Sequence, residues 1–352
     1  MSGRIILIFL VLTLPFSCVE PIDLDIDREG GQLVVYGHID DGSGPFFVQL
    51  QRTTAIPNRF QAETGARLTL HDDLGREGRF RTANEEGIYF YNAFTMPIEA
   101  GRTYTLRIRT AGMDFYESEP ETIPTFEAQS QVEVNFDRIE VNTGSFDAIV
   151  TKDIMQIRAT TILENPNARY FIRYFPTQTY RLDPTNFPDP FNSRPAPCFV
   201  TRPVEPENLP LYTSSGFEGL RIPSIFLGQQ EIDYAFRTRN IISVETHTIS
   251  EAAYRYWRKV SILLNSTGSI FDTPPAAIRG NIYNTGNPEE DVLGFFEASN
   301  IYVSRVEKWR GDFPYPVPED PCAFDPNRSD YPNYCIDCLI LEGSSFMRPP
   351  YY

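Results

Sequence analysis

Histidine, tryptophan and cysteine are scarce in this sequence, which limits the chemistry open to the chain. The 352 residues include three histidines, two tryptophans and five cysteines. His38, His71 and His247 lie far apart in the sequence and lack the His-Glu-x-x-His spacing of a zinc hydrolase. There is also no Gly-x-Ser-x-Gly motif to raise a serine nucleophile, and no glycine-rich phosphate loop at the start of a helix. We therefore expect no enzymatic activity, no metal site and no cofactor.

Positive charge is also in short supply. Lysine and arginine total 31 against 47 aspartates and glutamates, which gives a formal net charge of −16. A surface of that sign repels a phosphate backbone, so we expect no nucleic acid partner. The chain is nevertheless too apolar to be disordered, with 41% hydrophobic and 13% aromatic residues, and its 29 prolines supply turn positions. The composition favours a mostly β protein of about two domains.

Long hydrophobic runs are absent except near the start, at residues 5–14. A run of about ten residues is too short for a membrane-spanning helix of about 20 residues and is typical of a secretory signal. It is followed by a small residue and then Cys18, an arrangement that resembles the bacterial lipobox. The sequence therefore predicts a signal peptide over residues 1–17 and lipidation of Cys18. Because Pro15 and Phe16 depart from the strict lipobox, cleavage by an ordinary signal peptidase is the alternative.

The residues after the predicted lipidation site are strongly acidic. Four carboxylates occur within residues 20–27. We interpret residues 18–31 as an acidic tether, which resembles the surface-export signals of Bacteroidota lipoproteins. An ordinary solvated linker is the alternative interpretation.

Short alternating runs separated by turn residues fill residues 32–127, which we predict to form an immunoglobulin-like or transthyretin-like β-sandwich. Strands are expected at Leu33–Ile39, Phe46–Leu50, Ala66–Leu70, Ile88–Ala93 and Thr103–Arg109. In the last of these, strict alternation places Tyr104, Leu106 and Ile108 on one face, opposite the basic side chains. Residues 128–352 again favour strands and are predicted to form a larger β-rich domain.

One amphipathic helix is expected in this second domain. Thr248 and Glu251 have the spacing of a capping box, which marks the start of a helix. A helical apolar stripe follows it, at Ala253, Trp257, Val260 and Leu264. We interpret Trp257 as a core residue rather than as a platform for a ligand.

A proline- and aromatic-rich insertion occupies residues 176–226. Each proline lacks the backbone N–H that would donate a hydrogen bond to a neighbouring strand, so the recurring prolines argue against a central strand. The remaining possibilities are a long ordered loop or a series of short segments. Aromatic side chains on loops of a rigid β scaffold suit protein docking or stacking on sugar rings. About half of them are expected only to pack the domain. The candidates for a partner or ligand surface are Tyr180, Phe187, Phe191, Phe199, Tyr212 and Phe217.

Four cysteines remain after Cys18, namely Cys198, Cys322, Cys335 and Cys338. An even number in an exported chain predicts two disulfides, for which three connectivities exist. We expect Cys335 and Cys338 to pair outward rather than with each other, and so to staple the C-terminal tail to the domain. A four-cysteine zinc site is the disfavoured alternative, because it normally needs two paired knuckles and only one is present.

Several segments resemble a Bacteroidota family of outer-membrane lipoproteins classed as a domain of unknown function, DUF4249. The segments are Leu33–Gly37, Gly101–Leu106, Tyr254–Trp257, Ser269–Pro275, Gly280–Asn284, Val292–Phe296 and Cys335–Cys338. The resemblance covers essentially the whole mature chain. It implies a two-part extracytoplasmic β protein that is found near TonB-dependent transporters and has no assigned chemistry. Apart from that resemblance, Gly280 and Gly294 indicate close backbone approach or positive φ.

The expected function follows from the anchor, the β architecture, the lack of a catalytic motif and the resemblance. We expect a surface-exposed outer-membrane lipoprotein, held by its lipid, that acts as a non-enzymatic accessory or binding subunit of a TonB-dependent transporter in nutrient uptake. The alternative is an extracytoplasmic hydrolase of carbohydrate or peptide that uses a carboxylate pair, because such a pair is defined by distance in space and not by sequence.

Overall fold

The computed structural model describes residues 31–352 except 57–58, 82–84, 95, 143–148, 186–195, 205–208, 216–219 and 266–277. The predicted signal peptide and nearly all of the acidic tether lie outside these residues. The described part is mostly β, as predicted, and has a single α-helix, α2. None of its helices is long and apolar enough to cross a membrane.

The N-terminal half is a sandwich of two sheets around an apolar core. Strands predicted from alternation form as expected, and in β7 the buried side chains are Tyr104, Leu106 and Ile108. The first sheet contains β1 (Leu33–Asp40), β2 (Phe46–Thr53), β3 (Phe60–Ala62) and β6 (Ile88–Tyr91). The second contains β4 (Arg67–Asp72), β5 (Glu77–Arg79), β7 (Thr103–Arg109), β8 (Phe115–Ser118) and β9 (Glu121–Thr122).

Residues from far along the chain complete this sandwich. Strand β17 (Ile282–Asn284) pairs with β8, and β18 (Leu293–Lys308) pairs in parallel with β1. Their side chains Ile282, Phe296 and Ala298 belong to the sandwich core. The predicted sandwich over residues 32–127 is therefore one part of a unit that also needs residues 282–299, which adjacency in sequence could not indicate.

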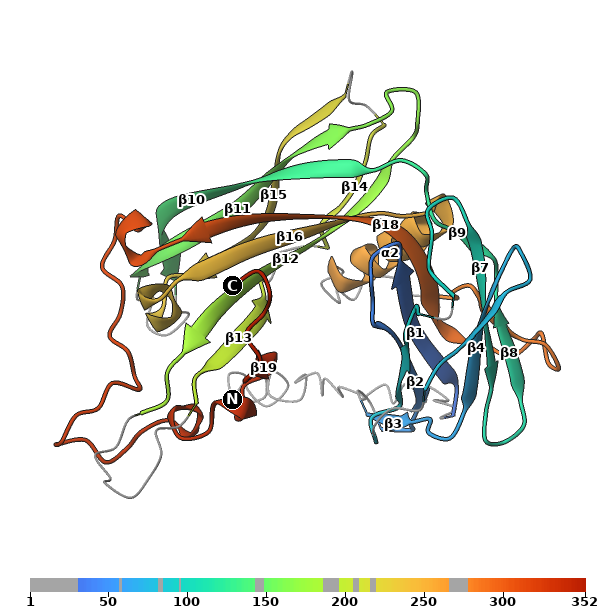
Figure 1. Ribbon diagram of the computed structural model, residues 1–352, viewed down its shortest axis with the longest axis horizontal. Helices are drawn as coiled ribbons and strands as arrows, with labels where there is room; N and C mark the ends of the chain where they lie inside the picture. The colour runs from blue at the N-terminus through green and yellow to red at the C-terminus, as the bar shows by residue number, and fades with distance from the viewer. Residues whose placement is uncertain are drawn as a thin grey trace, which may run out of the picture.

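Strand β18 is shared by the two halves of the molecule. One ten-stranded sheet runs through both, with the main order β19-β13-β12-β16-β18-β1-β2-β3, and Figure 1 shows β18 passing from the sandwich into the larger half. The remaining strands of the larger half in this sheet are β12 (Phe171–Leu182), β13 (Cys198–Pro203), β14 (Leu211–Thr213), β16 (Asn240–Thr248) and β19 (Ser344–Ser345). A second sheet of β10 (Ala128–Asn142), β11 (Ile149–Leu163) and β15 (Arg221–Glu231) packs against it around a second core.

The described parts of the proline-rich insertion include two short strands, and they also include part of a central one. Strands β13 and β14 both pair with β12, and β13 ends at Pro203. The expectation against a central strand was wrong at the start of the insertion, because residues 176–182 belong to β12, which pairs with β13 on one side and with β16 on the other. Its end also lies in a long strand, since residues 221–226 open β15.

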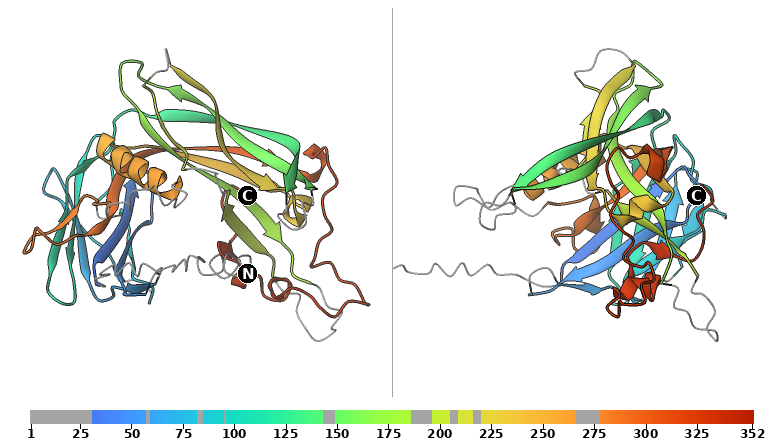
Figure 2. Two further views of the ribbon diagram at one scale, coloured as in Figure 1. Left: turned by 180° about the vertical axis from the view of Figure 1, so that it is seen from behind. Right: turned by 90° about the vertical axis from the view of Figure 1, so that its left-hand side faces the viewer.

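Helix α2 (Glu251–Asn265) lies where the two halves meet, as Figure 2 shows. Its N-cap is Ser250, whose hydroxyl oxygen accepts a hydrogen bond from the amide of Ala253 at 3.0 Å. The predicted cap at Thr248 was wrong, because Thr248 is still the last residue of β16 and pairs with Asn300. Ala253 and Trp257 are buried as predicted, whereas Leu264 is 68% exposed.

Short 3-10 helices and two disulfides organise the rest of the larger half. The 3-10 helices are η1 (Tyr234–Arg237), η2 (Arg310–Asp312), η3 (Asn333–Cys335) and η4 (Cys338–Ile340). Cys198 bonds to Cys338, and Cys322 bonds to Cys335. The outward pairing predicted for Cys335 and Cys338 is therefore confirmed, and the first bond ties the tail to β13. Figures 1 and 2 show the tail beside that strand.

Two glycines allow the backbones to approach closely where β18 begins. Gly294 has φ +93°, and a Cβ there would lie 1.9 Å from the carbonyl oxygen of Val35. At Gly280 a Cβ would lie 1.5 Å from the carbonyl oxygen of Gly294. Both sequence interpretations are confirmed, since Gly294 has a positive φ and any side chain at either position would collide with backbone.

A buried carboxyl joins α2 to the sandwich. Glu121 of β9 accepts a hydrogen bond from the N-cap hydroxyl of Ser250 at 2.7 Å and is 2% exposed. Burial, together with the charge of Glu297, raises the pKa of Glu121 to about 7.

This shift predicts that stability falls as pH rises. The carboxyl ionises near pH 4.5 in the unfolded chain and near 7 in the folded chain, so between these values the folded state holds a proton that the unfolded state has lost. Raising the pH across that window therefore lowers the free energy of unfolding, by roughly 3 kcal/mol at most for this group. We expect Glu121→Gln to flatten this part of the pH dependence in urea unfolding. The exposed Glu140 of β10 provides the control Glu140→Gln, which should keep the slope. An unchanged slope in Glu121→Gln would contradict the assignment.

Candidate functional site

A row of polar side chains crosses four adjacent strands on one face of the ten-stranded sheet. The register pairs Arg173 of β12 with His247 of β16, and His38 of β1 with Glu297 of β18. Ser299 lies on the same face of β18 as Glu297, because side chains alternate along a strand. Residues more than 250 positions apart in the sequence thereby lie side by side.

The two histidines meet at Ser299. The Ser299 hydroxyl lies 2.9 Å from Nε2 of His38 and 3.1 Å from Nδ1 of His247, and the two imidazole ring centroids are 4.8 Å apart. Oε1 of Glu297 lies 3.9 Å from Nε2 of His38. One ligand atom from each histidine and one from Glu297 all lie within 4.8 Å of one another. We call His38, His247 and Glu297 the histidine–glutamate cluster.

The remaining ring nitrogen of each histidine faces a carboxylate. Nδ1 of His38 is 3.8 Å from Asp40, and Nε2 of His247 is 3.5 Å from Glu245. Nε2 of His247 is buried and has no hydrogen-bond partner at shorter range. Both carboxylates come from the histidines' own strands, two residues away, so the strand period fixes them on the same face.

The second oxygen of Glu297 is held by α2 and β12. Nε1 of Trp257 donates to Oε2 at 2.5 Å, and the guanidinium of Arg173 lies 3.7 Å from the same atom. Arg173 in turn stacks between two rings, 3.6 Å from the centroid of Trp257 and 4.5 Å from that of Phe175. Trp257 is thus a buried residue, as predicted, and it also orients the carboxylate.

Burial and charge keep His38 neutral. Desolvation, followed by the charges of His247 and Arg173, holds the pKa of His38 well below its ordinary value. Desolvation also raises the pKa of Asp40. A neutral imidazole presents one free lone pair, so His38 can accept a hydrogen bond or ligate a metal ion.

Access to the cluster is one-sided. A quarter of the His38 side chain is exposed, compared with 4% for His247 and 3% for Glu297. A small ligand therefore reaches the buried members past His38, beside the half-exposed Tyr36.

The contacts of Ser299 resemble part of a catalytic triad, with His38 as base and Asp40 behind it. A nucleophile must reach its substrate, however, and Ser299 is 0% exposed. The 3.8 Å separation of Asp40 from His38 is also longer than a hydrogen bond. This geometry is suited to holding a small species rather than to attacking a carbonyl group.

No local motif in the sequence indicates this site. His38 and His247 lie far apart in the sequence, yet the fold places their ring centroids 4.8 Å apart. The available signal was a run of polar residues inside an otherwise buried strand: Glu297, Ser299 and Asn300 of β18 are all buried. Buried polar groups need partners, and such a run indicates partners elsewhere in the chain.

The three aromatic candidates of the insertion that the structure describes are not gathered on one surface. Tyr180 is 2% exposed and packs with the disulfides, so it is a core residue. Tyr212 packs on Tyr174, with ring centroids 5.7 Å apart, and Phe199 packs on Tyr352 at 5.0 Å. The other candidates, Phe187, Phe191 and Phe217, lie outside the described residues, as does Cys18.

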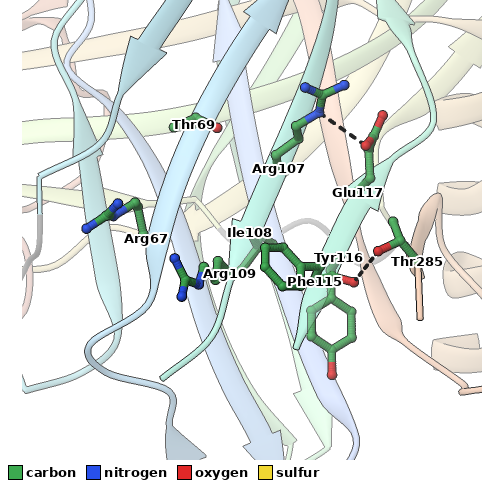
Figure 3. A pocket seen from close by; sticks show the side chains of 9 residues that line it. All are labelled: Arg67, Thr69, Arg107, Ile108, Arg109, Phe115, Tyr116, Glu117 and Thr285. Atoms are coloured by element: carbon green, nitrogen blue, oxygen red, sulfur yellow. Dashed lines mark hydrogen bonds and ion pairs between the residues drawn. The ribbon is translucent and has the colours of Figure 1, made fainter. Parts of the chain in front are cut away.

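A hollow of about 290 Å³ lies on the outer sheet of the sandwich between β4, β7 and β8. Figure 3 shows Arg107 pointing away from Arg67 and Arg109. Arg107 is paired with Glu117 at 3.1 Å, and Arg109 lies over the Phe115 ring at 5.5 Å. Because Arg107 points away from the other two and both Arg107 and Arg109 already have partners, this hollow is a weaker candidate than the histidine–glutamate cluster.

Comparison with known proteins gives a family but no activity. No curated protein is significantly similar to the chain. The model of a family described as a domain of unknown function, DUF4249, matches residues 19–305, which is most of the chain. The protein therefore belongs to the DUF4249 family.

Proposed function

We propose that this protein is a non-enzymatic binding lipoprotein of the bacterial outer-membrane surface. In this proposal Cys18 carries the lipid, residues 18–31 form the tether, and the folded body serves as an accessory subunit of a TonB-dependent transporter in nutrient uptake. The lipobox-like sequence supports a lipid anchor on Cys18. The resemblance to lipoproteins found near TonB-dependent transporters supports such a transporter as the partner.

The observation that carries the binding role is the histidine–glutamate cluster at the junction of the two halves. Its members come from three neighbouring strands and are fixed by contacts with Ser299, Trp257 and Arg173. A site whose polar groups are already in place does not have to order them on binding, which favours affinity.

The burial of two neighbouring glutamates, Glu121 and Glu297, argues against a role as a hydrolytic carboxylate pair. Glu121 and Glu297 are close enough for the charge of one to raise the pKa of the other, as in a glycosidase pair. Both residues are only 2% exposed, however, so a sugar ring cannot enter between them without opening the fold.

The anchor is tested by metabolic labelling with a fatty acid. Wild-type protein should take up label and Cys18→Ala should not, because in this proposal the lipid is attached through a thioether to the sulfur of Cys18. Immunoblotting would confirm equal amounts of the two proteins. Equal labelling of both would show that Cys18 is not the anchor.

The partner is tested by affinity purification from gently solubilised outer membranes of the native host. A TonB-dependent transporter should be recovered with the tagged protein and not with an unrelated outer-membrane lipoprotein carrying the same tag. Repeated recovery of the protein alone would count against the accessory role.

The part of the non-enzymatic assignment that concerns Ser299 is tested with a fluorophosphonate, which labels accessible activated serines. We expect no covalent adduct in intact-mass spectra, since Ser299 is enclosed. The matched control is Ser299→Ala. An adduct on wild type that disappears in this variant would identify Ser299 as a nucleophile and overturn the proposal.

A further inference from the structure

We propose that the histidine–glutamate cluster binds one divalent transition-metal ion of the zinc class. His38 and His247 each supply a ring nitrogen and Glu297 supplies Oε1. This inference names a ligand class for the binding role above and depends on that role only for its biological meaning.

The donor set selects the class of ion. Two imidazole nitrogens and one carboxylate oxygen are the ligands that borderline ions such as Zn²⁺ prefer, whereas Ca²⁺ and Mg²⁺ prefer oxygen alone. Three ligand atoms within 4.8 Å of one another are already close to a coordination sphere. Zn²⁺ bonds of roughly 2.0–2.1 Å place ligand atoms about 3.4 Å apart, so the cluster must contract by about an ångström. His38, the partly exposed member, has the most freedom to move.

The surroundings of the cluster have the form that metal ligands need. Ligating histidines typically donate a hydrogen bond from their other ring nitrogen to a carboxylate. Here Asp40 lies 3.8 Å from that nitrogen of His38 and Glu245 lies 3.5 Å from that of His247, so each pair has to shorten to form the hydrogen bond when the ion is bound. The second oxygen of Glu297 is likewise occupied, by Trp257 at 2.5 Å and by Arg173 at 3.7 Å. Each ligand is therefore oriented from behind. The remaining ring nitrogens, Nε2 of His38 and Nδ1 of His247, both face the Ser299 hydroxyl, which has to turn aside when an ion is bound.

The local charge also favours a dication. Three carboxylates surround the site, on Glu297, Asp40 and Glu245, against the single guanidinium of Arg173. An excess of negative charge in a partly buried site attracts a cation more strongly than it would in water. Three protein ligands also leave a coordination position free, on the side where His38 meets solvent, for water or a small anion.

The test uses the full mature chain, kept in solution by Cys18→Ala, purified without a polyhistidine tag and stripped with a chelator. Titration calorimetry with Zn²⁺ should give one site per chain, and Co²⁺ should give the visible absorption of a low-symmetry nitrogen and oxygen site. His38→Ala should weaken Zn²⁺ binding by at least about 100-fold, since it removes a ligand. His71→Ala is the matched control, because His71 bonds to Thr69 at 2.9 Å outside the cluster and should bind as wild type does.

A second variant keeps the test decisive if His38→Ala does not fold. Asp40→Asn leaves all three ligands in place and should weaken Zn²⁺ binding roughly 10- to 100-fold with the stoichiometry unchanged. No binding by the wild type, or equal affinity in wild type, His38→Ala and Asp40→Asn, would overturn the proposal, the latter by indicating an adventitious ion. The zinc titration needs neither a membrane nor a transporter. Zinc binding can therefore be absent even if the transporter co-purifies, and zinc can bind even if no transporter is recovered.

Discussion

The parallel pairing of β1 with β18 is the constraint on which the rest of this structure depends. It aligns Val34–Asp40 with Leu293–Ser299, so the first described strand lies beside one almost at the end of the sheet-forming chain. The ladder can close only because Gly294 has no side chain where the carbonyl of Val35 approaches. Completion of the sandwich, continuity of the ten-stranded sheet and the meeting of His38 with Glu297 all follow from this pairing. The site therefore exists only in the fully folded chain.

The buried ions of the site are hard to explain by stability alone. Taking Arg173 and Glu297 out of water costs more than their attraction alone returns unless further contacts satisfy both groups, and apolar residues of similar volume often stabilise a protein as well or better. The further contacts are present here, from the rings of Trp257 and Phe175 and from the indole N–H. A network so fully satisfied fixes the geometry of a carboxylate, which is useful to a binding site and unnecessary in a simple core.

Local sequence patterns predicted the local structure well, but they could not predict contacts between residues far apart in the sequence. The alternation of apolar residues predicted the strand at Thr103–Arg109 and its buried face, and the apolar stripe predicted the helix and the burial of Trp257. The cap was misplaced because Thr248 has a strand partner, Asn300, that local spacing cannot indicate. For a similar reason, the local sequence could not predict that His38 belongs to a site. His38 alternates with the core residues of β1, a pattern typical of a solvent-exposed face. Only the fold shows that polar side chains of β16 and β18 continue this face and that Trp257 of α2 packs on it.

Arg173 gives the clearest view of how the site is arranged, because a fixed cation beside a proposed cation site first looks like an obstacle. The guanidinium contacts Oε2 of Glu297, the oxygen that Trp257 also holds, while Oε1 faces His38. With one oxygen so engaged, the carboxylate cannot rotate freely, and its other oxygen stays directed at the histidines. The rings of Trp257 and Phe175, whose centroids lie 3.6 and 4.5 Å from the guanidinium, hold it beside this oxygen. Arg173 therefore acts as an orienting group behind the carboxylate, and α2, which supplies Trp257, is as much a part of the site as the strands.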